Sequence, residues 1–91
     1  MIRVFVLYPE PPDQERYEQH VELSRREVPH ATIRHGRIFG SPQGEPDFAY
    51  YFEYEFPDRD AFRASEGGLS KAAEDANAMG IDFRVFFASV Q

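Results

Sequence analysis

The chain has 91 residues, of which 42% are hydrophobic and 29% charged, and this balance is typical of one small folded domain. It contains no cysteine, so disulfides, thiolate chemistry and cysteine-bound metal centres are excluded. Its formal net charge of −6 disfavours nucleic acid as a partner, because phosphate backbones bind clustered positive charge. We find neither an apolar run long enough for a membrane span nor a signal peptide, and the sequence therefore predicts one cytoplasmic domain over residues 1–91.

The N-terminal part of the chain predicts a strand followed by a helix. Residues 2–9 are rich in β-branched and aromatic side chains, which favour a strand. Residues 13–28 predict a helix, with Asp13 as its N-cap. The inward stripe of this helix comprises Tyr17, Val21, Ser24 and Val28. His20 is expected at the edge of that stripe.

Two further strands are predicted in the middle of the chain, over residues 31–39 and 48–56. The intervening residues 40–47 (GSPQGEPD) are dense in glycine and proline, which indicates a turn. Because side chains alternate along a strand, the second of these strands places five aromatic side chains on one face. They are Phe48, Tyr50, Phe52, Tyr54 and Phe56.

A second helix is predicted after these strands, with Asp58 as its N-cap and Gly80 at its C-terminal end. Gly67 and Gly68 predict a break inside it, because glycine weakens a helix interior. Its inward residues are predicted to be Phe62, Ser65, Leu69, Ala72, Ala73, Ala76 and Met79. Residues 82–90 predict the last strand.

The resulting order βαββαβ predicts a ferredoxin-like α+β fold, an antiparallel sheet of strand order 4-1-3-2 with both helices on one face. Alternation assigns a mixed set of apolar and charged residues to the other face: Arg3, Phe5, Leu7, Tyr51, Glu53, Glu55, Arg84, Phe86, Ala88 and Val90. Exposing such a face costs about 25 cal/mol per Å² of apolar area. The sequence therefore predicts a homodimer in which two copies pack sheet against sheet.

Four segments of the chain resemble the EthD family in their order and spacing. They are residues 6–9 (VLYP), 17–29 (YEQHVELSRREVP), 39–47 (FGSPQGEPD) and 52–65 (FEYEFPDRDAFRAS), and the resemblance extends over about residues 2–90. It implies a dimeric α+β barrel, in which two ferredoxin-like sheets face each other.

The first helix of that family usually carries the pattern F-x-x-H/Y-Y-x-x-x-H-x-P-L. Tyr17 and His20 match its aromatic position and its first His/Tyr position, whereas residues 24–28 lack the later His-x-Pro-Leu. Some family members are described as reductases, and related families on this barrel include monooxygenases and isomerases. The resemblance thus implies a fold and leaves the reaction open.

The best candidates for chemistry are one histidine and four tyrosines. We predict His20 and Tyr8 as catalytic residues, because a histidine moves protons near neutral pH and a phenol donates a hydrogen bond to a carbonyl or enolate oxygen. Tyr17, Tyr50 and Tyr54 are predicted to line the substrate pocket with them, between the sheet and the first helix. The alternative is a half-buried structural histidine among ordinary core aromatics.

No metal or cofactor is predicted. The histidines His20, His30 and His35 lack metal-ligand spacing, and the glycines form neither a GxGxxG motif after a strand nor a P-loop. Arg34, His35 and Arg37 fit an anion-binding site or, equally, a solvated strand end.

Three hypotheses about function follow from these observations. The first is a cofactor-independent enzyme, an oxidoreductase or a proton-transfer isomerase, that acts on an apolar or aromatic small molecule. The second is a non-catalytic protein that binds such a molecule for a degradation or biosynthetic pathway. The third is a structural dimer with a filled core. The sequence leaves the substrate, the reaction and any assembly beyond a dimer open.

Overall fold

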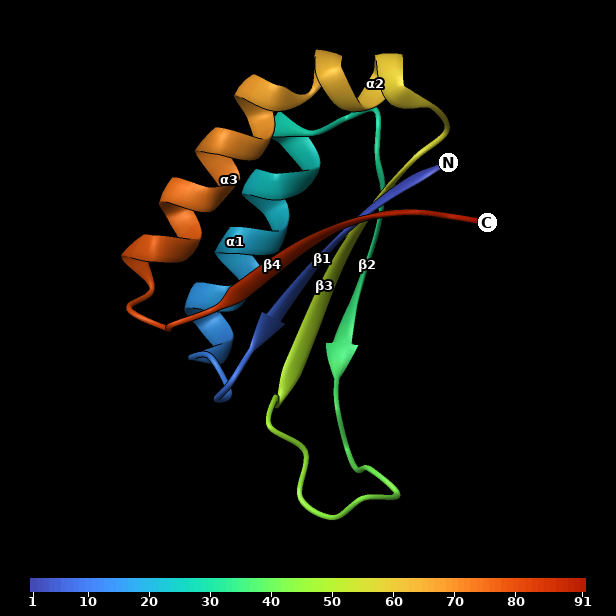
Figure 1. Cartoon of the computed structure of the whole chain (residues 1–91). Coiled ribbons are helices and arrows are strands. Elements are labelled where there is room, and N and C mark those ends of the chain that lie inside the picture. The colour runs from blue at the N-terminus through green and yellow to red at the C-terminus, as the bar shows by residue number, and fades with distance from the viewer.

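Four antiparallel strands form one sheet, and three helices lie on one side of it (Figure 1). The computed structural model describes residues 1–91. Its elements are β1 (Ile2–Tyr8), α1 (Gln14–Glu27), β2 (Thr32–Arg37), β3 (Tyr50–Phe56), α2 (Arg59–Ala64), α3 (Glu66–Ala78) and β4 (Arg84–Ser89). The strand order β2-β3-β1-β4 is the predicted one, and the ferredoxin-like fold is confirmed.

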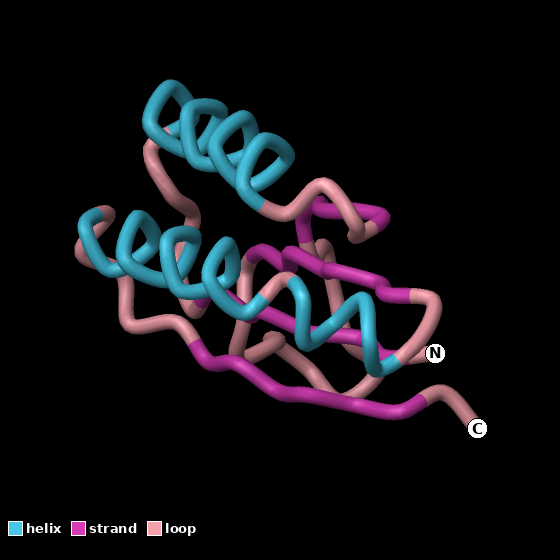
Figure 2. The backbone as a smooth tube through the Cα atoms, turned by 90° about the horizontal axis from the view of Figure 1, so that it is seen from above, coloured by secondary structure: helices cyan, strands magenta, loops and turns pink.

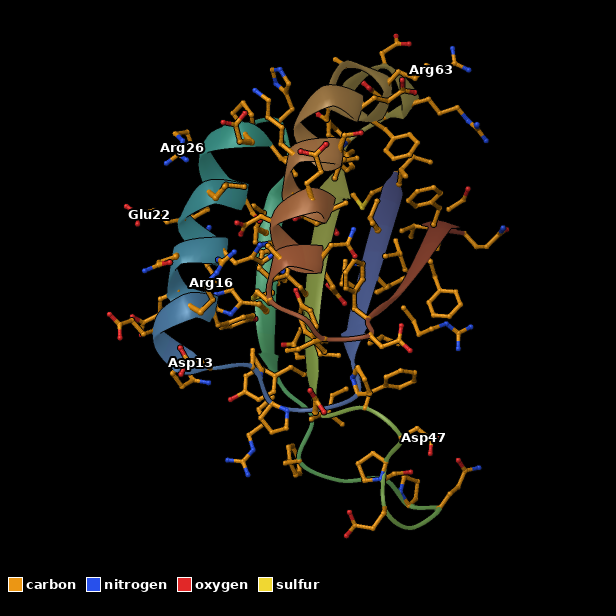
Figure 3. The ribbon with its side chains drawn as sticks, turned by 90° about the vertical axis from the view of Figure 1, so that its left-hand side faces the viewer. Asp13, Arg16, Glu22, Arg26, Asp47 and Arg63 are labelled. Atoms are coloured by element: carbon orange, nitrogen blue, oxygen red, sulfur yellow. The ribbon has the colours of Figure 1, made fainter.

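The first helix begins where the sequence predicted, because the Asp13 carboxylate accepts a hydrogen bond from the Arg16 backbone N–H at 3.0 Å. The sequence predicted His20 at the edge of the buried stripe. In the structure it is fully inside, with only 2% of its surface exposed. The reason is that α3 packs alongside α1 (Figure 3) and that Asp75 of α3 lies against the His20 ring, with Oδ2 2.8 Å from Nδ1.

The predicted break in the second helix is at a different residue. Ser65 separates α2 from α3, and its hydroxyl donates to the Ala61 carbonyl at 2.8 Å. Gly67 and Gly68 lie inside α3, so the prediction that they interrupt the helix is wrong. Gly68 is required by packing, since a Cβ at this position would collide with the backbone carbonyl of Glu27 at the end of α1.

The register of the strands confirms the predicted alternation. Val4 pairs with Tyr54 and Val6 with Phe52, and all four are buried under the helices. The face of the sheet that no helix covers, here called the open face, carries the alternate residues of each strand. Its members include Arg3, Phe5, Leu7, Arg34, Tyr51, Glu53, Glu55, Arg84, Phe86 and Ala88.

The edge strand β4 is covered incompletely on its helix side. Seen from above, it lies at the outer edge of the sheet (Figure 2). Val85 and Phe87 pair with Val6 and Val4 and so face the helices, yet Phe87 is 69% exposed. An apolar depression therefore separates β4 from α2 and α3.

None of the three helices has the length and apolar character that crossing a lipid bilayer requires.

Candidate active site

A cavity of about 500 Å³ lies between the helix side of β1 and β4 and the helices α2 and α3. Fifteen residues line it, and 12 of them are hydrophobic. They are Val4, Val6, Tyr8, His20, Tyr54, Phe62, Glu66, Leu69, Ser70, Ala72, Ala73, Ala76, Phe83, Val85 and Phe87. A site of this size and lining suits a small apolar ligand.

The cavity has a closed inner end and an exposed mouth. Tyr8, His20 and Tyr54 are buried and form the inner end. At the mouth the rings of Phe62 and Phe87 meet edge to face, with centroids 5.5 Å apart. Apart from Glu66 and Ser70, the lining between these rings and the inner end is apolar.

His20 is bound to a carboxylate that the sequence analysis did not select. Its Nδ1 lies 2.8 Å from Oδ2 of Asp75 on α3. Asp75 in turn accepts hydrogen bonds from Arg16, which stands one helical turn before His20 on α1. The pair and its arginine therefore connect the two helices that lie side by side (Figure 3).

Burial and these neighbours determine the protonation states of His20 and Asp75. Burial lowers the pKa of His20; the hydrogen bond to Asp75 opposes this, and the positive charge of Arg16 adds to it. The Arg16 guanidinium holds the pKa of the Asp75 carboxyl below its usual range. Near neutral pH the site thus consists of a neutral imidazole beside an ionised carboxylate.

The buried phenols differ in their hydrogen bonds. The hydroxyl of Tyr54 donates to the Ser24 hydroxyl at 3.1 Å, whereas the hydroxyls of Tyr8 and Tyr17 are buried without a protein partner. Burial raises the pKa of Tyr8, of Tyr17 and of Tyr54, so these groups remain protonated donors. Of the two unpartnered hydroxyls, only that of Tyr8 belongs to a residue that lines the cavity, which makes it the candidate hydrogen-bond donor to a ligand.

Three of the five predicted site residues line this cavity: Tyr8, His20 and Tyr54. The other two lie elsewhere. Tyr17 packs edge to face against Tyr8, with ring centroids 6.1 Å apart, and the hydroxyl of Tyr50 accepts a hydrogen bond from Gln14. The cavity lies under α2 and α3 and not, as the sequence suggested, between the sheet and α1.

Three charged groups of the sheet form ion pairs with one another. Glu55 pairs with Arg3 at 3.0 Å and with Arg34 at 3.5 Å. His35 stacks on the ring of Phe52, with centroids 5.6 Å apart. No group of three or more histidine, aspartate or glutamate side chains is arranged to hold a metal ion.

Comparison with known proteins places this arrangement among ferredoxin-like α+β proteins. No family model and no curated protein matches the chain. It is similar to an EthD family protein from Bacillus halodurans, with a TM-score of 0.77 and 21% identity over 100% of this chain and 99% of that one. It is also similar to a dimeric ferredoxin-like protein of unknown function from Jannaschia, with a TM-score of 0.71 and 19% identity over 98% of both chains.

A more distant likeness is to SnoaB from Streptomyces nogalater, described as a cofactor-independent oxygenase. Its TM-score is 0.56 at 17% identity, over 99% of this chain and 91% of that one. At these identities the comparisons establish the fold, and they confirm the resemblance to EthD proteins in that respect. The functional conclusion has to come from the site itself.

Proposed function

We propose that this protein is a cofactor-independent enzyme that moves a proton on an apolar or aromatic small molecule. His20 is its base, Tyr8 its hydrogen-bond donor, and Tyr54 borders the ligand. One observation carries the proposal: a buried histidine held by a carboxylate and a buried phenol without a protein partner both line a cavity whose walls are mostly hydrophobic.

The two groups suit complementary steps. A neutral His20 accepts a proton from a C–H next to a carbonyl or from a phenol O–H. Tyr8 remains protonated and donates to the substrate oxygen on which negative charge grows. In an isomerase the proton returns to another carbon of the same molecule. In an oxidoreductase, as the likeness to a cofactor-independent oxygenase suggests, dioxygen is the co-substrate that accepts the electrons of the deprotonated substrate.

The lining also restricts the charge of the ligand. It contains no lysine or arginine, and its one carboxylate is Glu66 at the exposed mouth. An anionic substrate would lose its hydration without gaining a counter-charge. The proposed substrate is therefore uncharged and carries an oxygen that Tyr8 can reach.

Proton exchange in D₂O tests the proton-transfer step by itself, whichever reaction follows it. Enolisable carbonyl compounds that carry apolar or aromatic groups are incubated with the protein, and loss of the acidic C–H signal is followed by NMR. We expect His20→Ala to reduce the exchange rate about 100-fold or more, and Tyr8→Phe about tenfold, while both variants remain folded. His30→Ala, at an exposed histidine outside the cavity, is the matched control.

Equal exchange rates for the wild type and His20→Ala would contradict the proposal. Saturable binding of a compound with neither exchange nor turnover would instead favour the second hypothesis, a binding protein for an apolar metabolite. The apolar lining fits that role as well, so the exchange experiment separates the two.

We also propose that two copies associate through their open faces into a barrel-like dimer. The exposed apolar residues of this face support it, as does the similarity to a Jannaschia protein described as dimeric. Sedimentation velocity at micromolar concentration tests this directly, and a monomer would contradict it.

A further inference from the structure

We propose that Asp75 and Arg16 are positioning residues that hold the proton of the His20 ring on Nδ1 and so leave its basic lone pair on Nε2. This inference rests on the proposed role of His20 as a base. It adds the residues that decide which ring nitrogen is basic.

The geometry fixes the carboxylate from two sides. Nη2 of Arg16 lies 2.7 Å from Oδ1 of Asp75, and Nη1 lies 3.2 Å from Oδ2. The same Nη2 donates to the backbone carbonyl of Asp75 at 3.2 Å. The planar guanidinium thus bonds three acceptors of a single residue, which fixes the orientation of the carboxylate toward His20.

The charges then fix the position of the proton. An ionised carboxylate only accepts hydrogen bonds, so the short contact between Oδ2 and Nδ1 requires the ring to donate from Nδ1. A neutral imidazole carries one N–H, and Nε2 must therefore be the acceptor. None of the hydrogen bonds that the protein forms engages Nε2.

No other group that faces the ring competes for this role. Asp75 and Arg16 are the charged neighbours, from α3 and α1. From the sheet, Phe52 lies beside the ring with centroids 5.5 Å apart, and the phenols of Tyr8 and Tyr54 stay neutral. The ring is buried, whereas the side chains of Arg16 and Asp75 remain 31% and 18% exposed, so the two charges keep part of their hydration.

Asp75→Asn is the sharpest test, because it preserves shape and removes the charge. Arg16 only donates, so it keeps the amide oxygen and turns the amide NH₂ toward His20. Nδ1 must then accept, and the ring proton moves to Nε2. We expect two-bond ¹H–¹⁵N NMR to show Nδ1–H in the wild type and Nε2–H in Asp75→Asn, with the exchange rate of the variant reduced about 100-fold or more.

Glu74→Gln is the matched control, since Glu74 is the neighbouring acid on α3, is exposed and forms no ion pair. It should leave the ring tautomer and the exchange rate unchanged. A second variant, Arg16→Gln, removes the positive charge that disfavours protonation of the ring, so the NMR titration midpoint of His20 should move to higher pH. This variant carries the test if Asp75→Asn fails to fold.

An Nε2–H tautomer in the wild type would overturn the inference, and so would an Nδ1–H tautomer that survives in folded Asp75→Asn. An unchanged or lower titration midpoint of His20 in Arg16→Gln would show that Arg16 has no part in positioning the ring. These readouts need no substrate, so they stand apart from the proposed function. If the wild type shows the expected tautomer but no exchange activity, the enzyme proposal is refuted and the inference about Asp75 stands.

Discussion

The two faces of the sheet come from the same four strands, but the chain covers only one of them. Under the helices Val4 and Phe52 are fully buried, whereas Phe86 on the open face is 45% exposed. Both faces carry apolar side chains, so composition does not decide which becomes the core. The connections decide it, because both crossovers return on the same side of the sheet.

The faces also differ in how they hold charge. On the open face, the ion pairs Arg3–Glu55 and Arg34–Glu55 join neighbouring strands. On the covered side, the charges of Arg16 and Asp75 lie at the contact between two helices and act on a buried ring. The difference agrees with the two proposals made above, a site for chemistry on the covered face and a dimer contact on the open face.

Of the proposed variants, Phe5→Lys should have the largest effect, because it should weaken association of two copies through the open face. Phe5 lies opposite Glu53 on one side and Phe86 on the other, so a lysine can pair with Glu53 in the single chain. In a sheet-to-sheet dimer each copy loses a buried aromatic and gains a buried cation. We expect the dimer dissociation constant to rise about 100-fold or more, measured by sedimentation.

Phe39→Lys is the control for that variant, because Phe39 is 97% exposed and lies in the loop between β2 and β3, outside the face. It should leave the association unchanged. Equal dissociation constants for Phe5→Lys and the wild type would show that the open face is not the interface.

The two glycines of α3 test how closely this helix packs against the end of α1 on the covered face. Gly68→Ala should lower the free energy of unfolding by about 1–3 kcal/mol, because its Cβ would force α3 away from Glu27. Gly67→Ala should raise it by up to about 1 kcal/mol, because a Cβ there meets open space and glycine disfavours a helix interior. Urea denaturation measures both, and equal effects would contradict the close approach of the helices.

Lowering the pH should have the smallest effect, a decrease in the free energy of unfolding caused by the histidines on the covered side. Burial keeps the pKa of His20 and of His35 below the ordinary value of about 6.5. Between that value and the folded pKa, the unfolded chain binds more protons than the folded protein. Stability should therefore be constant with respect to these groups above pH about 6.5 and fall as the pH drops below it.

Urea titrations from pH 8 to pH 5 measure this dependence. His20→Gln should reduce the slope below pH about 6.5, because the more deeply buried of the two histidines is then absent. A slope equal to that of the wild type would mean that His20 titrates normally in the folded protein.

Much of the fold was predictable because it depends on local patterns. The period of two in β1 and β3 assigned each residue to its face, and Asp13 and Asp58 marked the starts of the two helical segments. The break at Ser65 was not predictable from propensity. Glycine at position 68 reflects the approach of another helix, which a local pattern does not contain.

The candidate site was only partly predictable for a similar reason. His20 stood out as a histidine at the edge of the inward stripe of the first helix, but its burial depends on how α3 packs on α1. Asp75 had one weak signal, a carboxylate between Ala72 and Ala76 on a helix rich in alanine. Its pairing with His20 joins residues 55 positions apart, and only the docked helices bring them together.

The mouth and the inner end of the cavity come from different parts of the chain. Phe62 on α2 and Phe87 on β4 frame the mouth, whereas the polar groups of the inner end are carried by α1, α3 and the central strands. Substitutions at the two phenylalanines would change which molecules are admitted without disturbing His20. In the proposed enzyme, ligand preference and proton transfer would therefore be separable, and a library of variants at these two positions would be a direct engineering route.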